Sequence, residues 1–196
     1  MKTFQTIEPD PSVDGRLIKT AVSPRPIAWV STVSEDGVDN LAPFSSYNYI
    51  SSSPPVLGFN TGIWPDGRLK DTPRNAIDTG EFVVNVVTHD VAEAMIRTAE
   101  DIPSDESEFD HAGVERLPSD EVAPPRVADA VVSMECTLHD SMRVYDRMVV
   151  LGDVVRYHVA EEALVDGKIE SLKLDTVGRM GGPYYTRTEA FEYGGE

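Results

Sequence analysis

Cysteine is nearly absent from this sequence, and long apolar runs are absent altogether. The 196 residues include one cysteine, Cys136, so no disulfide can form within the chain, and we expect Cys136 to be a buried structural thiol. No apolar stretch approaches the roughly 20 residues that a transmembrane helix needs. The N-terminus becomes acidic and proline-rich before the apolar core of a signal peptide could form, so we expect the protein to stay in the cytoplasm.

Positive charge is also scarce. The chain has 17 Lys and Arg residues against 34 Asp and Glu residues, a net charge of −17. Such a surface repels nucleic acid, which excludes proteins that bind a phosphate backbone. A solvated acidic shell is the simplest interpretation. Adaptation to concentrated salt, which screens the repulsion between like charges, is the alternative hypothesis.

Several motifs that define common enzyme classes are missing. The chain has no Gly-x-Gly-x-x-Gly turn, no Gly-x-x-x-x-Gly-Lys-Ser/Thr loop and no Gly-x-Ser-x-Gly elbow, which argues against the corresponding dinucleotide, nucleotide and hydrolase folds. The four histidines show no paired spacing, so we expect no metal site. They are His89, His111, His139 and His158.

What the sequence does contain is mostly β-strand pattern. Five runs rich in β-branched and aromatic residues lie between Gly, Pro, Asp and Ser: 26–33, 54–60, 81–88, 130–138 and 148–160. The Asp-Gly turn within 34–38 predicts that 26–33 and 38–45 are antiparallel neighbours. With no regular alternation of strands and helices, the pattern predicts a mainly β protein, a closed or nearly closed antiparallel barrel within a single domain, 1–196.

Two helices are marked by their end signals. In 71–80 we expect Asp71 or Thr72 as the N-cap, Pro73 in the first turn and Gly80 as the stop. In 90–100, Asp90 and Glu93 have the spacing of a capping box. Segment 99–125 carries nine acids and four prolines, and we expect it to be an exposed excursion from the barrel.

A small group of positive residues stands out against the acidic background. Arg25 lies between two prolines, and Arg68, Lys70 and Arg74 cluster at the start of the first predicted helix. A helix N-terminus with Lys70 and the Thr72 hydroxyl beside it suits a phosphate group.

The serine-rich stretch 42–60 would face this site. Alone it is typical of a surface turn. Beside the positive cluster, its serines and Asn48 could bond a polar ring system, with Trp29, Tyr47 and Tyr49 as aromatic walls. The combination predicts a phosphorylated aromatic ligand.

Five segments, in order, carry a resemblance to a known family. They are RPIAWVST (25–32), NLAPFSSYNYISSSPPVLGF (40–59), KDTPRNAIDTGEFVVNV (70–86), PPRVADAVVSMECTL (124–138) and VGRMGGPYYTR (177–187). The chain resembles the flavin reductase-like proteins of the FMN-binding split-barrel superfamily. The resemblance implies a homodimer of six-stranded antiparallel split barrels of Greek-key type, with FMN near the subunit interface.

The resemblance also implies a set of FMN-binding residues. They are Trp29, Ser31, Thr32, Pro43, Phe44, Ser45, Ser46, Tyr47, Asn48, Ser51, Ser52, Lys70 and Thr72. Within this set, Trp29, Ser31 and Thr32 would lie near the ring, the 43–48 loop along the isoalloxazine and ribityl chain, and the other four at the ribityl and phosphate end. No side chain is expected to be a catalytic acid or base, because the flavin carries the redox chemistry.

The implied activity is hydride transfer from NADH or NADPH to FMN, which would supply reduced flavin or electrons to a partner oxygenase or redox protein. The alternative is a flavoredoxin-like electron carrier that holds FMN tightly and lacks a nicotinamide site of its own. Oxidation of a specific organic substrate is a third option, since one fold supports several chemistries. We expect neither nucleic acid nor a membrane as a partner.

Overall fold

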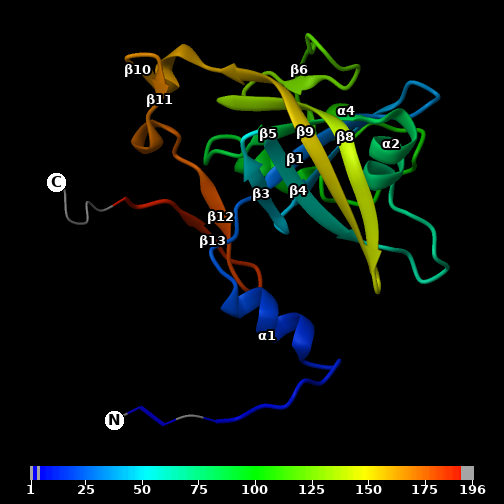
Figure 1. Ribbon diagram of the computed structural model, residues 1–196, viewed down its shortest axis with the longest axis vertical. Coiled ribbons are helices and arrows are strands. Elements are labelled where there is room, and N and C mark those ends of the chain that lie inside the picture. The colour runs from blue at the N-terminus through cyan, green and yellow to red at the C-terminus, as the bar shows by residue number, and fades with distance from the viewer. Residues whose placement is uncertain (1, 4, 191–196) are drawn as a thin grey trace.

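One strongly curved antiparallel sheet forms the centre of the molecule (Figure 1). The computed structural model describes residues 2–3 and 5–190, and within them this sheet has seven strands in the order β2-β1-β5-β8-β9-β4-β3. The strands are β1 (Ala28–Val33), β2 (Asp39–Phe44), β3 (Tyr47–Ser52), β4 (Pro55–Gly62), β5 (Glu81–Val86), β8 (Val132–Val144) and β9 (Arg147–Val159). The mainly β split-barrel prediction is confirmed.

A two-residue link joins the two edge strands of the sheet. Strands β2 and β3 lie at its opposite edges, yet only Ser45 and Ser46 separate them. So short a link brings the two edges together at this point. The N–H of Asn60 in β4 donates to the Ser46 carbonyl at 3.1 Å, which continues the β3–β4 pairing into the link. Six strands were expected, and the seventh is β3, which forms within the serine-rich stretch whose sequence alone is typical of a turn.

All five predicted strand runs and the hairpin are present. Strands β1 and β2 pair antiparallel from Ala28 opposite Phe44 to Val33 opposite Asp39. Gly37 in the turn has φ +83°, a conformation that glycine adopts without steric cost. Val38 then donates its N–H to the Ser34 hydroxyl at 3.0 Å. The Asp-Gly signal therefore predicted both the turn and the antiparallel pairing of these two strands.

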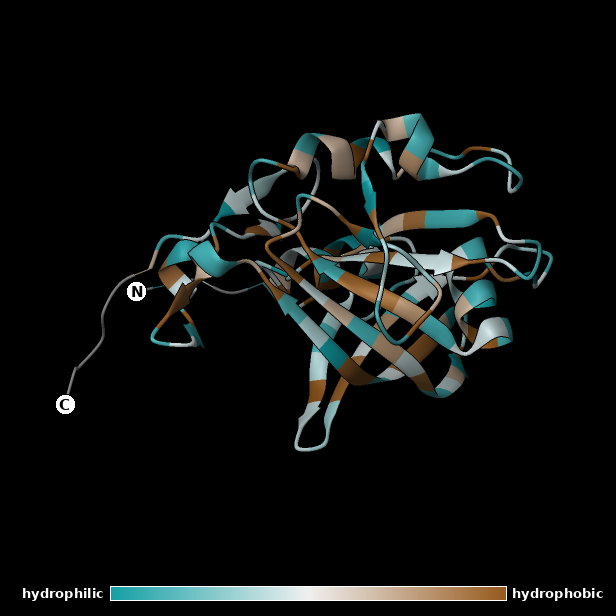
Figure 2. Ribbon diagram, turned by 90° about the horizontal axis from the view of Figure 1, so that it is seen from above, coloured by the Kyte–Doolittle hydropathy of each residue, from teal (hydrophilic) through white to brown (hydrophobic). Residues whose placement is uncertain are grey.

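Strand β1 separates two apolar cores, because successive side chains of a strand point to opposite faces. Ala28 and Val30 join the barrel interior with Phe59 and Phe82, whereas Trp29 joins a second core. The curved strands show this alternation as bands of brown and teal (Figure 2). Cys136 is buried in the barrel interior, and burial raises the pKa of its thiol.

The second core lies between the sheet and its helices. Met95 of α3 (Ala92–Arg97) and Phe109 of α4 (Glu108–Ala112) pack there with Trp29 and Leu41. The segment 99–125 is therefore more than an exposed excursion, since it buries Phe109 completely and also Ala112, Val114 and Val122. The short pair β6 (Arg116–Leu117) and β7 (Arg126–Val127) closes this segment.

Both predicted helices form, but neither uses the predicted N-cap. Helix α2 (Asp71–Thr79) follows Lys70, and the Thr72 hydroxyl instead accepts a hydrogen bond from the Asn40 side chain at 2.8 Å. Helix α3 follows Val91, and no side chain caps it, so the predicted Asp90 capping box is wrong. Gly80 does end α2, with φ +77°.

An arm made from both ends of the chain stands beside the barrel (Figure 1). It consists of helix α1 (Asp14–Ala21) and the antiparallel pair β12 (Val177–Arg179) and β13 (Tyr185–Arg187). Arg25 joins these parts, because its guanidinium donates to the carbonyls of Lys19, Val22 and Met180. Helix α1 buries none of its residues.

The remaining elements are short. They are the strand pair β10 (Leu164–Val165) and β11 (Lys168–Ile169) and the 3-10 helices Glu161–Ala163 and Ser171–Lys173. Among the described residues, every helix is too short or too polar to cross a membrane.

Candidate functional site

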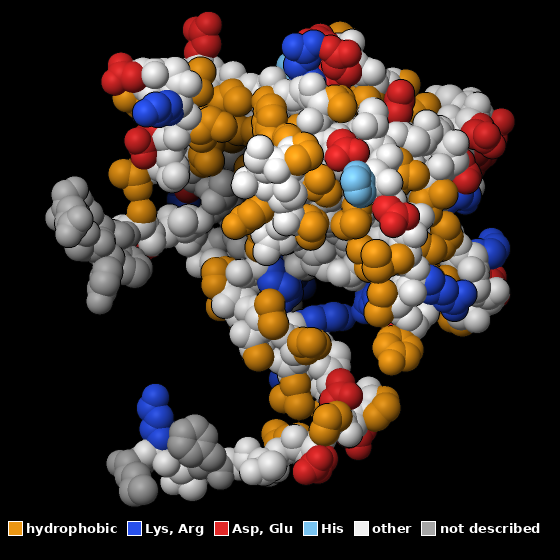
Figure 3. Space-filling model, in the orientation of Figure 1, with side chains coloured by type: hydrophobic (Ala, Val, Ile, Leu, Met, Phe, Trp, Pro, Cys, Tyr) orange, Lys and Arg blue, Asp and Glu red, His pale blue; other side chains and the backbone are white. Residues whose placement is uncertain are grey.

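A pocket of about 750 Å³ lies between the open end of the barrel and the arm. We call it the cationic pocket. Figure 3 shows Lys and Arg side chains at the rim of a hollow in this region. Its walls are Ile18, Lys19, Val22, Arg25, Pro43, Phe44, Ser45, Ser46, Asn60, Thr61, Gly62, Lys70, Arg147, Arg179, Met180, Gly181 and Gly182.

The charge of this pocket is opposite to that of the whole chain. Five Lys and Arg residues line it, and among the described residues no Asp or Glu does. These cations come from separate elements: Lys19, Arg25, Lys70, Arg147 and Arg179. In a chain of net charge −17, such a concentration creates a local positive potential that favours an anionic ligand.

Two of the five cations are held by neighbouring groups other than carboxylates. Arg25 is bonded to three carbonyls, as described above. The Arg179 guanidinium lies 4.4 Å from the centre of the Tyr185 ring and donates to the Tyr184 carbonyl at 3.3 Å. These contacts orient the side chains without neutralising them, so their charge remains available to a ligand.

Lys70 is the cation at the start of helix α2. Its ammonium lies 4.8 Å from the centre of the Trp64 ring, a cation–π contact. The other two members of the predicted positive cluster are paired with acids: Arg68 with Asp66 and Arg74 with Asp71, each at 2.6 Å. Of that cluster, only Lys70 lines the cationic pocket.

Five of the predicted FMN-binding residues meet in the cationic pocket: Pro43, Phe44, Ser45, Ser46 and Lys70. The break between β2 and β3 explains four of them, because it places 43–46 at the barrel end. Phe44 also packs on Phe59 of the barrel interior, with ring centres 5.0 Å apart. An apolar wall and a polar loop therefore lie on the same side of the pocket.

Three predicted residues lie in the interior instead. Trp29, Ser31 and Thr32 have no exposed surface. The Trp29 indole donates to the Thr98 hydroxyl at 2.8 Å, Ser31 donates to the Pro125 carbonyl, and Thr32 accepts from Asn75 at 3.3 Å. Their hydrogen bonds are already made inside the protein, so their positions do not support the expected contacts with the flavin ring.

Three others lie along β3, away from Lys70. Ser51 and Ser52 pair with Val56 and Pro55 at the far end of the hairpin. At about 3.4 Å per residue, Ser52 lies about 17 Å along the strand from Tyr47. Neither Ser51 nor Ser52 lines the two described pockets that contain Lys70. Asn48 is exposed and accepts from the Tyr49 N–H at 2.9 Å.

Tyr47 and Thr72 line neighbouring pockets. Tyr47 faces a cavity of about 600 Å³ on the other side of Arg25, and burial raises the pKa of its hydroxyl to about 12. Thr72, almost fully buried, lines a smaller pocket beyond Lys70.

Sequence reasoning missed three of the five cations: Lys19, Arg147 and Arg179. Lys19 lies in α1, Arg147 begins β9 and Arg179 ends β12. These elements lie outside the serine-rich stretch in sequence, and only the fold brings them together. A weak signal existed for Arg179, because the segment VGRMGGPYYTR belongs to the family pattern. Lys19 and Arg147 had none.

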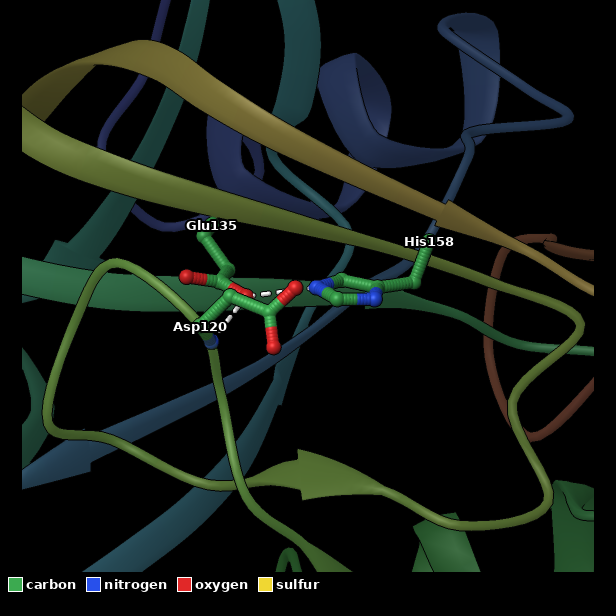
Figure 4. A group of neighbouring side chains, drawn as sticks. All are labelled: Asp120, Glu135 and His158. Carbon is green, nitrogen blue, oxygen red and sulfur yellow. Dashed lines mark hydrogen bonds and ion pairs between the residues drawn. The ribbon is translucent and has the colours of Figure 1, made fainter.

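One cluster of titratable side chains was not expected (Figure 4). Asp120, Glu135 and His158 have ligand atoms within 4.8 Å of one another. However, the fully buried Glu135 carboxylate accepts the N–H groups of Asp120 at 2.8 Å, Glu121 at 2.6 Å and Val122 at 3.2 Å, and His158 Nε2 lies 2.5 Å away. These donors occupy the lone pairs of the Glu135 carboxylate. The cluster therefore holds the 118–124 loop against the sheet and leaves few oxygen lone pairs for a metal ion.

The comparison with known sequences identifies the class. The flavin reductase like domain matches residues 21–173, and the chain belongs to this family. Membership supports a flavin as cofactor or substrate and flavin reduction as the general activity.

Individual relatives are similar to this chain over nearly its whole length. A protein of Aquifex aeolicus is 40% identical over 185 residues, which cover 94% of each chain. The crystal structure of nitrilotriacetate monooxygenase component B from Bacillus cereus has a TM-score of 0.92 and 32% identity, covering 98% of this chain and 100% of that one. The 2-nitrobenzoate 2-nitroreductase of Pseudomonas fluorescens has a TM-score of 0.86 and 30% identity, covering 98% and 96%.

Proposed function

We propose that this protein is a flavin oxidoreductase that transfers a hydride from NADH or NADPH to FMN, with FMN in the cationic pocket. The observation that carries the proposal is the pocket itself: five cations and no described acid, beside the Phe44 wall, in a family of flavin reductase-like proteins. A phosphate needs the cations, and a flavin ring needs an apolar wall with a few polar donors.

The residues present fit FMN. Lys70 and the N-terminus of α2 would hold its phosphate, with Arg147 contributing charge from β9. Pro43 and Phe44 would lie against the ring system, and Ser45 with the neighbouring backbone would bond its polar edge. A volume of about 750 Å³ is within the range of pockets that enclose a ligand of this size.

The bound flavin would supply the redox chemistry, so the chain's own residues bind and orient. Donors on the loop at Ser45 would stabilise negative charge that develops on the ring, which is the role of preorganised dipoles in catalysis. The arm would limit water on the side facing α1. No side chain of the pocket is assigned a proton-transfer role.

The physiological partner is proposed from the family. A neighbour in structure is component B of a monooxygenase, so delivery of reduced flavin or electrons to an oxygenase or another redox protein is the role we favour. Because reduced nicotinamide nucleotides are co-substrates of the cell interior, the proposal places the enzyme in the cytoplasm.

We also propose that the protein works as a homodimer. Leu17 and Ile18 of helix α1 and Val22 just after it are 42%, 62% and 57% exposed, and Ile18 and Val22 line the cationic pocket. A second subunit on this face would bury the apolar side chains and close the pocket mouth.

Absorption spectroscopy tests the function. We expect purified protein to bind FMN, and NADH or NADPH to bleach the flavin absorbance within a catalytic assay. A flavin-loaded protein that neither nucleotide bleaches but that a redox protein reduces would favour the flavoredoxin-like carrier. A protein that neither binds FMN nor accelerates nucleotide oxidation would contradict both.

A second candidate function is direct reduction of an organic substrate by the bound flavin. The similarity to a 2-nitrobenzoate 2-nitroreductase, at 30% identity, favours it. Nucleotide oxidation that depends on added nitrobenzoate, and that free FMN does not replace, would distinguish this activity from flavin reduction.

A further inference from the structure

A smaller pocket of about 290 Å³ continues from the cationic pocket past Lys70. The two share Pro43, Phe44, Thr61 and Lys70 as walls. We call the smaller one the Trp64 pocket. Because the walls are shared, one ligand can extend through both, with Lys70 at the junction.

The sign of the charge changes across this junction. Beyond Lys70, four acids line the Trp64 pocket: Asp71, Glu100, Asp101 and Glu108. A phosphate group would be repelled there, whereas the cationic pocket favours it. The cleft therefore suits a ligand with an anionic part at one end and hydrogen-bond donors at the other.

Two of the four acids, Glu108 and Asp101, have no cationic side chain as a partner among the described residues. Asp71 pairs with Arg74, and Glu100 lies 2.8 Å from His111 Nε2. Glu108 uses one oxygen, Oε2, to accept the Leu41 N–H at 2.9 Å. Among the described residues, its other oxygen and the Asp101 carboxylate have no hydrogen-bond partner. Burial raises the pKa of the Glu108 carboxyl, the mark of a partly desolvated acid that a donor would stabilise.

Trp64 gives the pocket an aromatic surface. Its indole remains 41% exposed, with the Lys70 ammonium 4.8 Å from the ring centre. A tight turn holds it, because the Trp64 N–H donates to the Arg68 carbonyl at 2.9 Å and the Gly67 N–H donates to the Trp64 carbonyl at 2.8 Å. A held, partly exposed aromatic ring is a stacking platform for a flat base.

We infer that the Trp64 pocket binds the adenine ring of an adenosine phosphate whose phosphates lie in the cationic pocket. Adenine stacks on an aromatic ring, and its exocyclic amino group donates to a carboxylate such as Glu108 or Asp101. The volume of about 290 Å³ is large enough to hold the ring. Both NAD(P)H and FAD contain this group, and the inference rests on the proposed function for the rest of the ligand.

Tryptophan fluorescence tests the inference directly. The chain has two tryptophans, of which Trp29 is fully buried in the second core and Trp64 lines the pocket. Adenosine monophosphate should change the emission of Trp64, and Trp64→Phe should remove that change. Uridine monophosphate, which lacks the exocyclic amino group, and inorganic phosphate should have much smaller effects.

Calorimetry with matched variants gives the affinity. Trp64→Ala should weaken adenosine monophosphate binding about fivefold or more, which corresponds to the loss of one stacked base, and Trp64→Phe should restore most of it. Asp101→Asn should also weaken binding. Asp105→Asn, in the same acidic segment but on a different pocket, is the control and should not.

Two further measurements identify the source of the adenosine. If it belongs to the nicotinamide nucleotide, Trp64→Ala raises KM for NADH while the affinities for FMN and FAD hold. If it belongs to the flavin, the variant weakens FAD but not FMN. Adenosine monophosphate that leaves Trp64 emission unchanged, with unaltered FAD affinity and NADH KM in Trp64→Ala, overturns the inference. Failure to bind FMN at all would instead contradict the proposed function.

Discussion

Lys70 lies at the start of helix α2, where the cationic pocket and the Trp64 pocket meet. Its backbone carbonyl accepts the Arg74 N–H at 3.1 Å, so the residue is fixed at the first turn of α2. Its ammonium contacts Trp64 rather than an acid. A phosphate at this point would combine a full charge with the positive end of the helix dipole.

Replacing Lys70 should therefore weaken FMN binding. Lys70→Ala should cost about 1.5–3 kcal/mol of binding free energy, the range for a hydrogen bond to a charged group. Fluorescence titration of FMN measures it, and Lys173→Ala, remote from the pocket, is the control. Unchanged FMN affinity in Lys70→Ala would place the phosphate elsewhere.

Glu135 shows how a buried carboxyl group can remain ionised at neutral pH. Its burial raises the pKa of the carboxyl, but the N–H groups of Asp120 and Glu121 and the side chain of His158 outweigh that effect and lower the pKa below its usual value of 4.5. The ionised form is thus the one that the fold stabilises. Its contribution is present above that value and is lost as pH falls through the lowered pKa.

Glu135→Gln should destabilise the protein by about 1–3 kcal/mol at pH 7, because an amide presents a donor to N–H groups that need an acceptor. The difference from the unmodified protein should shrink as the pH is lowered below 4.5 in chemical denaturation. Asp120→Asn keeps its backbone N–H and should be nearly neutral. A large effect of Asp120→Asn would indicate a bound cation in the cluster.

At single positions, residue type alone did not predict which side chains line the cationic pocket. Trp29, Ser31 and Thr32 belong to the segment that resembles the family, yet burial on both faces of β1 leaves them with no exposed surface. Pro43 and Phe44 do line the cationic pocket, because the break that follows them fixes them at an open edge. Their contact with FMN stays a prediction. Burial on both faces of a strand depends on the helices packed outside it, which a local sequence pattern does not contain.

Among the elements, the arm depends on one side chain. Arg25→Ala would leave the carbonyls of Lys19, Val22 and Met180 without their shared donor. We expect faster amide hydrogen exchange in 14–22, a severalfold loss of FMN affinity and little change in the unfolding of the barrel. Arg16→Ala, within helix α1 but outside the pocket, should leave exchange in this segment and FMN affinity unchanged. Slow exchange in Arg25→Ala would mean that other contacts hold the arm.

The elements of the barrel were predictable, whereas the arm was not. Strands β1, β4, β5, β8 and β9 have the apolar composition of buried strands, and local turn chemistry set the β1–β2 register. Helix α1 has no buried residue, so no local pattern tied it to the barrel. Its place depends on hydrogen bonds between segments about 155 residues apart, such as Arg25 to Met180.

At the scale of the whole molecule, the acidic charge opposes the approach of anionic ligands. A net charge of −17 repels both FMN and a nicotinamide nucleotide at long range, although the pocket itself is positive. Salt shortens that range to about 3 Å at 1 M. We expect the reductase rate of the folded protein to rise with salt before any change in stability. A rate that falls steadily with salt in a folded protein would contradict this.

The dimer proposal can be checked by mass. Light scattering should give twice 21.5 kDa for the protein, and Leu17→Glu, on the exposed face of α1, should shift it toward the monomer. Val165→Glu, with 43% exposure at β10, is a control for surface charge. A monomer in both the unmodified protein and the variants would overturn the proposal.

The matched family region, 21–173, ends before β12 and begins at the last residue of α1. The matched region therefore supplies Arg25, Lys70 and Arg147 to the cationic pocket. The other two cations of the pocket, Lys19 and Arg179, lie outside the matched region. During divergence, ligand preference can then change through substitutions in the two terminal segments, with the inherited barrel and its folding left intact.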